Sequence, residues 1–332
     1  MATSKQAHAI QMRSYGPPAV LTGVEVILPP LGPNEVRIRT IAAAVNHTDL
    51  KIRAGIWPLG KADPFPYVPG AEVIGDVDDV GASAGDIRKG DRVITMMQGL
   101  GGVRAERPGG YAEYVTVAAD AVAGVPSGID PYDMAAIGLV GVTAYEGLRR
   151  IGPLAGKRIL VTGAAGGIGS AATAIARAQN ASVLGLVSRP VQIDDVRALG
   201  ANEVIVVPKG EVPTSLQPES LDGVLDAVGG GLFGPCVEAL RRNGVLSLVG
   251  AVAGSEVRFD AWSLIRPVTL TGYSSETLDG PALRNAVTAL ADWLVRGAIK
   301  PPARTHFPLA QAARAHALLE CGGVTGRVLL VP

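Results

Sequence analysis

The sequence predicts an α/β protein in which an irregular all-β domain precedes a parallel sheet with helices. The first observation is a short apolar run, Ile159–Val161, which meets a glycine-dense turn and then the alanine-rich segment Ser170–Arg177. The second is that strand and helix patterns continue to alternate from there to residue 207. The third is that residues 1–125 consist of short strand patterns separated by proline- and glycine-rich turns.

The turn Gly163–Gly169 carries the strongest single signal. Its glycines lack side chains, so the backbone can approach a pyrophosphate, and the free N–H groups that begin the following helix favour an anion. The spacing alone proves little, because glycine supplies 43 of 332 residues and the pattern departs from G-x-G-x-x-G. The surrounding sequence supports a dinucleotide-binding element, because a strand, a helix and a strand are expected next, at Ala181–Val187, Val191–Leu199 and Glu203–Val207. A parallel α/β unit that binds no nucleotide is the alternative.

Composition and charge narrow the class of protein. A length of 332 residues suggests two domains, and 48% hydrophobic residues indicate a globular chain with a large core. The 30 basic and 30 acidic side chains balance, which disfavours nucleic-acid or membrane-surface binding. Met1–Met12 is polar and no apolar run reaches about 18 residues, so neither a leader nor a membrane span is expected. Two cysteines and four scattered histidines predict reduced thiols, a cytoplasmic location and no metal site.

Polar and titratable residues gather in Val45–Gly55, directly after a predicted strand, and active-site loops often lie at such a place. The alternative is a solvated single-turn helix capped by Asn46. The strands expected around this segment are His8–Met12, Val20–Ile27, Glu35–Ala44, Arg92–Thr95 and Gly109–Val117.

Helical periodicity begins after residue 130, with a helix expected over Met134–Arg150. Beyond the nucleotide-binding element, the expected strands are Leu221–Ala227, Gly244–Val249, Val268–Tyr273, Arg304–Pro308 and Arg327–Val331. The expected helices are Phe233–Arg241, Leu283–Arg296 and Leu309–Glu320.

Several motifs, spread along nearly the whole chain, carry a resemblance to a known family. They are Asn46-x-x-Asp49-x-x-x-Arg53-x-Gly55, Phe65-Pro66-Tyr67-Val68-Pro69-Gly70-Ala71-Glu72-x-x-Gly75, Gly90-Asp91-Arg92-Val93, Gly110-Tyr111-Ala112-Glu113-Tyr114, Thr143-Ala144 and Ala164-Ala165-Gly166-Gly167-Ile168-Gly169. Through them the chain resembles the medium-chain dehydrogenase/reductases, and within these the zinc-independent quinone oxidoreductase (zeta-crystallin-like) branch. The resemblance implies a GroES-like, partly open β-barrel catalytic domain at residues 1–125 and 275–332. It implies a six-stranded Rossmann domain at 126–274, with the cofactor in the cleft between the two.

The resemblance also implies roles for individual residues. Asn46 would lie against the nicotinamide ribose and the substrate, and Thr143 near the nicotinamide. The residues expected on the pyrophosphate are Ala165, Gly166, Gly167 and Ile168. The loop Gly250-Ala251 would flank the nicotinamide.

Zinc members of the family use a Cys after the third strand, a Gly-His-Glu and a four-cysteine lobe. Here Asn46-His47-Thr48-Asp49 carries no Cys, and Pro69-Gly70-Ala71-Glu72 has no His before its acid. His47 and Glu72 cannot alone build a zinc site, so no metal is expected.

Without a Lewis acid to stabilise an alkoxide, the resemblance implies hydride transfer to a quinone or another α,β-unsaturated carbonyl. The quinone branch often has tyrosines where this chain has Lys51 and Trp57. Lys51 is a candidate proton donor if it is desolvated, or else a solvated lysine. Trp57 either stacks on a flat substrate or anchors its loop.

Two alternatives to this function stay open. One is an enoyl reductase that acts on an acyl thioester, although a neutral chain is mildly unfavourable for a substrate that carries phosphates. The other is not an enzyme: an NADPH-binding redox sensor, or an RNA-binding or structural protein like the crystallins of this family.

The end of the second Rossmann strand favours NADPH over NADH. It reads Leu186-Val187-Ser188-Arg189-Pro190 and lacks the acid that binds a ribose 2′-hydroxyl in NAD-specific sites. Ser188 and Arg189 are the candidate ligands of a 2′-phosphate. Relatives often place a lysine and a tyrosine on this phosphate, at the positions of Gln192 and Val207.

The apolar segment Val268–Tyr273 is expected to form the edge strand of the Rossmann sheet. A bare edge invites pairing, and the resemblance implies that two such edges join across a two-fold axis into a homodimer.

Overall fold

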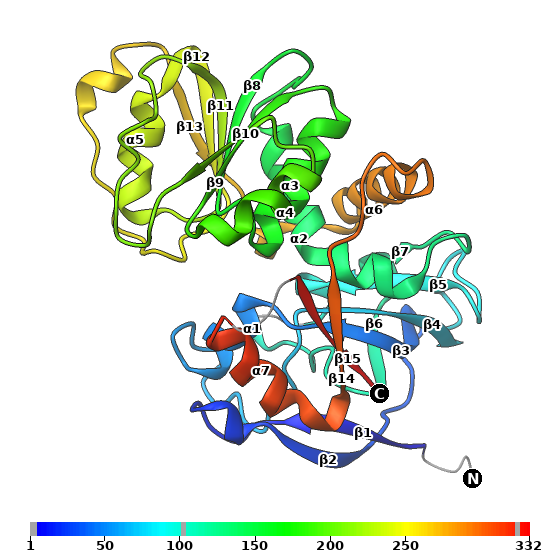
Figure 1. The fold of residues 1–332 in the computed structure, drawn as a ribbon. Helices are drawn as coiled ribbons and strands as arrows, with labels where there is room; N and C mark the ends of the chain where they lie inside the picture. The colour runs from blue at the N-terminus through cyan, green and yellow to red at the C-terminus, as the bar shows by residue number, and fades with distance from the viewer. Residues whose placement is uncertain (1–4, 101–103, 323–325) are drawn as a thin grey trace. The chain divides into compact units, whose positions relative to one another are not determined.

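The computed structural model describes residues 5–100, 104–322 and 326–332. The chain forms two compact units, which Figure 1 shows as ribbons. The first unit contains residues 1–139, 275–292 and 301–332, and the second contains residues 140–274 and 293–300. The expected boundary at 125/126 therefore differs from the observed one at 139/140, which falls inside a helix. Residues 293–300, expected in the catalytic domain, belong to the second unit.

The first unit is built mainly from strands. They are β1 (Gln6–Gln11), β2 (Thr22–Ile27), β3 (Glu35–Ala44), β4 (Glu72–Val80), β5 (Arg92–Met96), β6 (Tyr114–Ala118), β7 (Ala123–Gly124), β14 (Arg304–Pro308) and β15 (Arg327–Val331). A seven-stranded sheet has the order β14-β15-β3-β4-β5-β7, with β6 paired to β3, and β1 pairs with β2. The C-terminal strand β15 thus lies beside β3, with Leu329 opposite Ala44. This pairing joins the two ends of the sequence in one sheet.

Three helices accompany these strands. They are α1 (His47–Arg53), α7 (Ala312–Glu320) and α6 (Gly280–Val295), whose residues from Trp293 onward belong to the second unit. A fourth, α2 (Pro131–Arg149), begins in this unit and is kinked at Gly138, whose φ of −24° and ψ of −107° are not helical. The kink releases a backbone N–H from the helix, and this group becomes part of the site described below.

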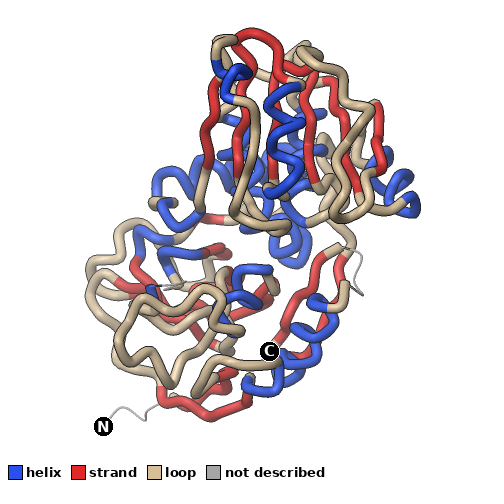
Figure 2. Tube along the Cα trace, turned by 90° about the vertical axis from the view of Figure 1, so that its left-hand side faces the viewer, coloured by secondary structure: helices blue, strands red, loops and turns tan. Residues whose placement is uncertain are grey.

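The second unit is a parallel sheet with helices, and Figure 2 shows its strands side by side. The strands are β8 (Arg158–Thr162), β9 (Ser182–Val187), β10 (Glu203–Val206), β11 (Leu221–Asp226), β12 (Leu240–Leu248) and β13 (Thr269–Gly272). The helices between them are α3 (Gly167–Ala178), α4 (Ile193–Ala198) and α5 (Phe233–Glu238). The order β10-β9-β8-β11-β12-β13 is that of a Rossmann sheet, so the predicted fold class is confirmed.

Sequence patterns placed the Rossmann strands closely but extended one helix too far. The helix expected over Phe233–Arg241 ends at Glu238, because Leu240 already pairs with Leu221 in the sheet. The strand β12 accordingly begins four residues before the expected Gly244. Among the described residues, no helix has the length and apolar character needed to cross a membrane.

Candidate active site

The glycine turn of the second unit forms a cradle at the start of α3. Gly163 follows β8 with φ +58°, a left-handed conformation that favours glycine, and the Gly166 N–H donates to its carbonyl at 2.8 Å. A Cβ on Gly169 would lie 2.1 Å from the Gly163 carbonyl oxygen, so this close approach requires glycine. Helix α3 starts at Gly167 without a side-chain cap. Its first N–H groups have no acceptor within the helix, and the cradle fits the pyrophosphate of a dinucleotide.

The cradle lies at the point where the strand order reverses, between β8 and β11, which is where open α/β sheets bind ligands. Buried hydrogen bonds hold the two strand ends together there. The Thr162 hydroxyl donates to Asp226 Oδ1 at 2.6 Å, and the same oxygen accepts the N–H groups of Val228 and Gly229 at 2.9 and 3.0 Å. Sequence reasoning missed this pair, although both residues stand at the ends of predicted strands.

The other predicted cofactor residues lie at loops of this unit. Ser188 and Arg189 follow β9, and Gln192 Oε1 accepts both of their backbone N–H groups, at 3.2 and 3.0 Å. The Arg189 side chain is exposed. Gly250-Ala251 follows β12 and packs against the loop after β11, where Ala253 N–H donates to the Val228 carbonyl at 2.9 Å. Thr143 is buried in α2.

In the first unit, Asn46 stands directly before α1, and a buried cluster surrounds it. Asn46 Nδ2 donates to Glu72 Oε1 at 2.8 Å and to the Ala44 carbonyl at 3.2 Å. Arg327 Nη2 donates to Asn46 Oδ1 at 2.8 Å and to Glu72 Oε1 at 3.0 Å. Glu72 Oε2 accepts the Leu139 N–H, freed by the kink in α2, at 2.6 Å. The predicted residue Asn46 is thus joined to Glu72, which the sequence analysis considered only as an incomplete zinc ligand, and to Arg327, which it did not select.

The Glu72 side chain is shielded from water, with an exposed fraction of 1%. Desolvation raises the pKa of this carboxyl, while the Arg327 guanidinium and the Asn46 amide act in the opposite direction. A carboxylate that accepts bonds from a guanidinium, an amide and a backbone N–H has compensation for its desolvation.

A second buried polar group lies one helical turn beyond Asn46. Asp49 Oδ2 accepts the Asn46 backbone N–H at 2.8 Å, which caps α1. Burial raises the pKa of Asp49 to about 7, and the charge of Glu72 adds to the rise. The Tyr111 hydroxyl hydrogen-bonds to His316 Nε2 at 3.0 Å, and burial lowers the pKa of His316 to about 3. The segment after β3 is therefore a helix with Asn46 at its N-cap position, as the alternative expected, but the helix is largely buried rather than solvated.

Of the three predicted catalytic residues Asn46, Lys51 and Trp57, the last two contact each other. Lys51 Nζ lies 4.4 Å from the centre of the Trp57 ring, in a cation–π contact. The Lys51 carbonyl also accepts the Trp57 N–H at 3.2 Å, which ties the loop back to α1. Trp57 remains 39% exposed. Lys51 lies in α1, which begins directly after Asn46, and Trp57 lies in the loop that follows α1.

Two family models match parts of this chain. Residues 32–127 match the alcohol dehydrogenase GroES-like domain, and residues 199–330 match the zinc-binding dehydrogenase model. The pig quinone oxidoreductase is 30% identical over the full length of both chains. The chain belongs to the medium-chain dehydrogenase/reductase family, among the quinone oxidoreductases.

Two further members of this family are informative. The NADPH-dependent alkenal/one oxidoreductase of Arabidopsis thaliana chloroplasts is 30% identical over 92% of this chain and 74% of its own length. The Escherichia coli quinone oxidoreductase, solved as a complex with NADPH, is 27% identical with a TM-score of 0.85, covering 98% of this chain and all of that one. The first is named for its action on alkenals and alkenones, and the second was solved with NADPH bound.

Both oxygens of Glu72 accept hydrogen bonds, and the Arg327 guanidinium lies 3.0 Å from one of them. A divalent cation at Glu72 would be repelled by this guanidinium. Within residues 5–100, 104–322 and 326–332, no group of three or more His, Cys, Asp or Glu side chains is placed to hold a metal ion. The donor set around Glu72 does not fit a catalytic zinc.

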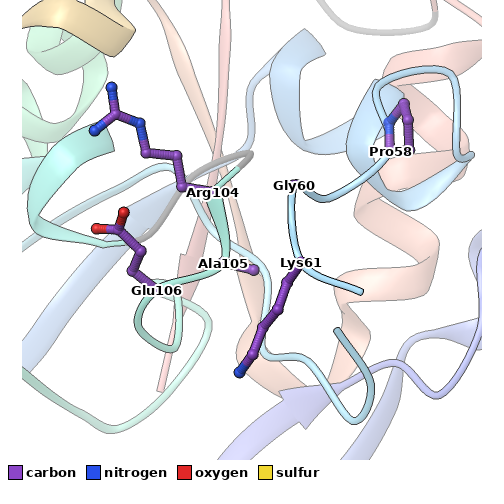
Figure 3. A pocket seen from close by; sticks show the side chains of 6 residues that line it. All are labelled: Pro58, Gly60, Lys61, Arg104, Ala105 and Glu106. Carbon is purple, nitrogen blue, oxygen red and sulfur yellow. The ribbon is translucent and has the colours of Figure 1, made fainter. Parts of the chain in front are cut away.

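A separate cavity of about 600 Å³ lies on the loops after Trp57 and after β5. Figure 3 shows its lining, to which Lys61 and Arg104 contribute cations and Glu106 a carboxylate. The Lys61 and Arg104 side chains point in different directions in this view, so they do not converge on one point.

Proposed function

We propose that this chain is an NADPH-dependent reductase that transfers hydride to a quinone or another α,β-unsaturated carbonyl without zinc. The observation that carries the proposal is that the Glu72 carboxylate already accepts hydrogen bonds from Arg327, Asn46 and the Leu139 N–H. Such a site orients groups but supplies no Lewis acid, so it suits an acceptor that is already activated. Relatives named as quinone and alkenal/one oxidoreductases support the same reaction class.

Each predicted site residue has a proposed role in cofactor binding or in the reaction. The backbone N–H groups at Gly166, Gly167 and Ile168 bind the pyrophosphate, with Ala165 beside them, and Asn46 accepts a hydrogen bond from the nicotinamide ribose. Bound NADPH supplies the hydride. Thr143, Gly250 and Ala251 position the nicotinamide. Lys51 donates the proton that the reduced acceptor needs, and Trp57 presents an aromatic face to a flat acceptor.

The test is a screen of the purified chain with NADPH and quinones, enones, enals and an enoyl thioester, followed at about 340 nm, with and without a chelator. We expect steady NADPH oxidation with a quinone or an enone, unaffected by the chelator. Binding of NADPH without turnover would instead favour a sensor or structural protein. Loss of bound zinc together with activity would contradict the metal-free mechanism.

An enoyl reductase acting on an acyl thioester is the second candidate. The observation in its favour is the cavity near Lys61 and Arg104, whose two cations point in different directions and suit separate phosphate groups of such a substrate rather than a single one. A kcat/KM with the enoyl thioester that exceeds the values for all quinones and enones would select this candidate.

Arg189 is proposed to read the 2′-phosphate of NADPH, together with Ser188. Its exposed guanidinium stands at the end of β9, and a hydrogen bond to a charged group contributes roughly 1.5–3 kcal/mol. We therefore expect Arg189→Ala to lower kcat/KM for NADPH at least about tenfold while leaving NADH nearly unchanged. Steady-state kinetics with both cofactors measure this. An equal loss for both cofactors, or no loss, would show that Arg189 does not contact the phosphate.

A homodimer through β13 is also proposed. This strand is the last in the order of its sheet, and the segment before it exposes Trp262 at 75% and Ile265 at 73%. An open edge beside exposed apolar side chains favours pairing with a second copy. We expect light scattering to give about twice the chain mass of 34.0 kDa for the wild type. We expect Ile265→Asp to shift the measured mass toward the 34.0 kDa of a single chain. A wild-type protein that stays at 34.0 kDa at micromolar concentration would contradict the dimer.

A cytoplasmic location is proposed because both cysteines of the chain are free thiols. Cys236 is buried and Cys321 exposed, and neither forms a disulfide. Free thiols of this kind suit a reducing compartment. Cell fractionation with an antibody to the chain checks the location.

A further inference from the structure

The side-chain amide of Asn46 has a single orientation in its cluster. Glu72 carries acceptor oxygens only, and Arg327 carries donors only. The amide must therefore turn Nδ2 toward Glu72 and Oδ1 toward Arg327, as observed at 2.8 Å in each case. The reverse orientation would place the amide oxygen against the Glu72 carboxylate and the amide N–H groups against the Arg327 guanidinium, so that neither pair could form a hydrogen bond.

The donors of this amide are both in use. One N–H of Nδ2 is directed to Glu72 Oε1 and the other to the Ala44 carbonyl at 3.2 Å. The oxygen Oδ1 accepts one bond, from Arg327, and a carbonyl oxygen has two lone pairs. Asn46 can therefore offer a bound molecule an acceptor but no donor, which matches a hydroxyl group.

Arg327 reaches this position through the sheet. It begins β15, which pairs with β3 in the register Leu329–Ala44, and the Val45 N–H donates to the Val328 carbonyl at 2.9 Å. The Arg327 N–H in turn donates to the Ala303 carbonyl at 2.7 Å. Its side chain is 7% exposed, so the guanidinium is held in place beside Asn46.

We propose that Arg327 is a positioning residue for the reductase: with Glu72, it holds the Asn46 amide as a hydrogen-bond acceptor for a hydroxyl of the cofactor ribose. The assignment rests on the proposed NADPH-dependent function. Arg327 acts through Asn46 and not on the substrate. Its removal would free the amide to turn and leave the Glu72 carboxylate buried without its cation.

The test is a double-mutant cycle on the full chain, with the NADPH Kd measured from nicotinamide fluorescence. We expect Arg327→Met to raise the Kd about tenfold or more, since the ribose hydroxyl loses its fixed acceptor. Arg327→Lys retains a positive charge with three N–H donors for Asn46 Oδ1 and Glu72 Oε1, and should restore the Kd to within about threefold. In an Asn46→Ala background, Arg327→Met should change the Kd by less than about twofold, because its effect passes through the amide.

Arg37→Met is the matched control, since Arg37 is also buried on β3 but hydrogen-bonds to the Pro29 carbonyl. It should lower the melting temperature without changing the Kd. If Arg327→Met does not fold, Arg327→Gln, which retains a donor without the charge, replaces it in the same cycle with the same expected coupling. Equal effects of the Arg327 change in both backgrounds, or none in either, would overturn the inference while the reductase function stands. A wild-type chain that binds no NADPH would overturn both.

Discussion

Gly169→Ala is expected to weaken NADPH binding at least about 100-fold, the loss of roughly two hydrogen bonds to a charged group. The added Cβ would lie 2.1 Å from the Gly163 carbonyl oxygen and 2.6 Å from its carbonyl carbon. Both atoms are backbone, so the turn itself must open, and the N–H groups that begin α3 move away from the pyrophosphate. Fluorescence titration with NADPH measures the effect.

Gly231→Ala provides the matched control in the same unit. A Cβ at Gly231 meets nothing within 4 Å, and its φ is not in the left-handed range. This variant should bind NADPH like the wild type, with a stability change within about 1 kcal/mol. If Gly169→Ala binds NADPH as tightly as this control, the cradle does not hold the pyrophosphate.

The stability of the chain is expected to fall as pH rises from about 4 to about 7 because of Asp49. In the folded chain its pKa is about 7, against an ordinary value of 3.8. The folded state therefore keeps a proton that the unfolded state releases, and the stabilisation is complete below the lower value and lost as pH rises through the higher one. A difference of about three pKa units corresponds to about 4 kcal/mol.

Urea unfolding of the wild type and Asp49→Asn between pH 4 and pH 8 measures this contribution. The variant cannot ionise at this position, so its stability relative to the wild type should rise with pH by about 4 kcal/mol. His316, with its pKa lowered to about 3, gives a slope of the opposite sign, which is common to both proteins and cancels in the difference.

Asp49→Ala separates the charge from the hydrogen bond. It removes the same titration and also the acceptor for the Asn46 N–H, so it should show the same slope with an added cost of about 1–3 kcal/mol at every pH. A difference between wild type and Asp49→Asn that does not change with pH would show that Asp49 is not held protonated.

Much of the second unit could be predicted from sequence because its signals are local. The strand β8, the glycine turn and α3 follow one another within Arg158–Ala178, and their conformations depend on apolar runs, missing side chains and helix propensity. The first unit was predictable in kind but less in detail. Asn46 was selected from its place after a strand, whereas no sequence pattern placed Arg327 beside it.

The sequence by itself determined the α/β class, the dinucleotide-binding turn and the family, since each depends on residue types at short spacing. Tertiary structure decided the chemistry around Asn46. The Asn46 side chain bonds to residues 26 and 281 positions away, and those separations close only when β4 and β15 pair with β3. A buried carboxylate, amide and guanidinium can compensate one another's desolvation only in contact, and contact across such distances is a property of the folded sheet.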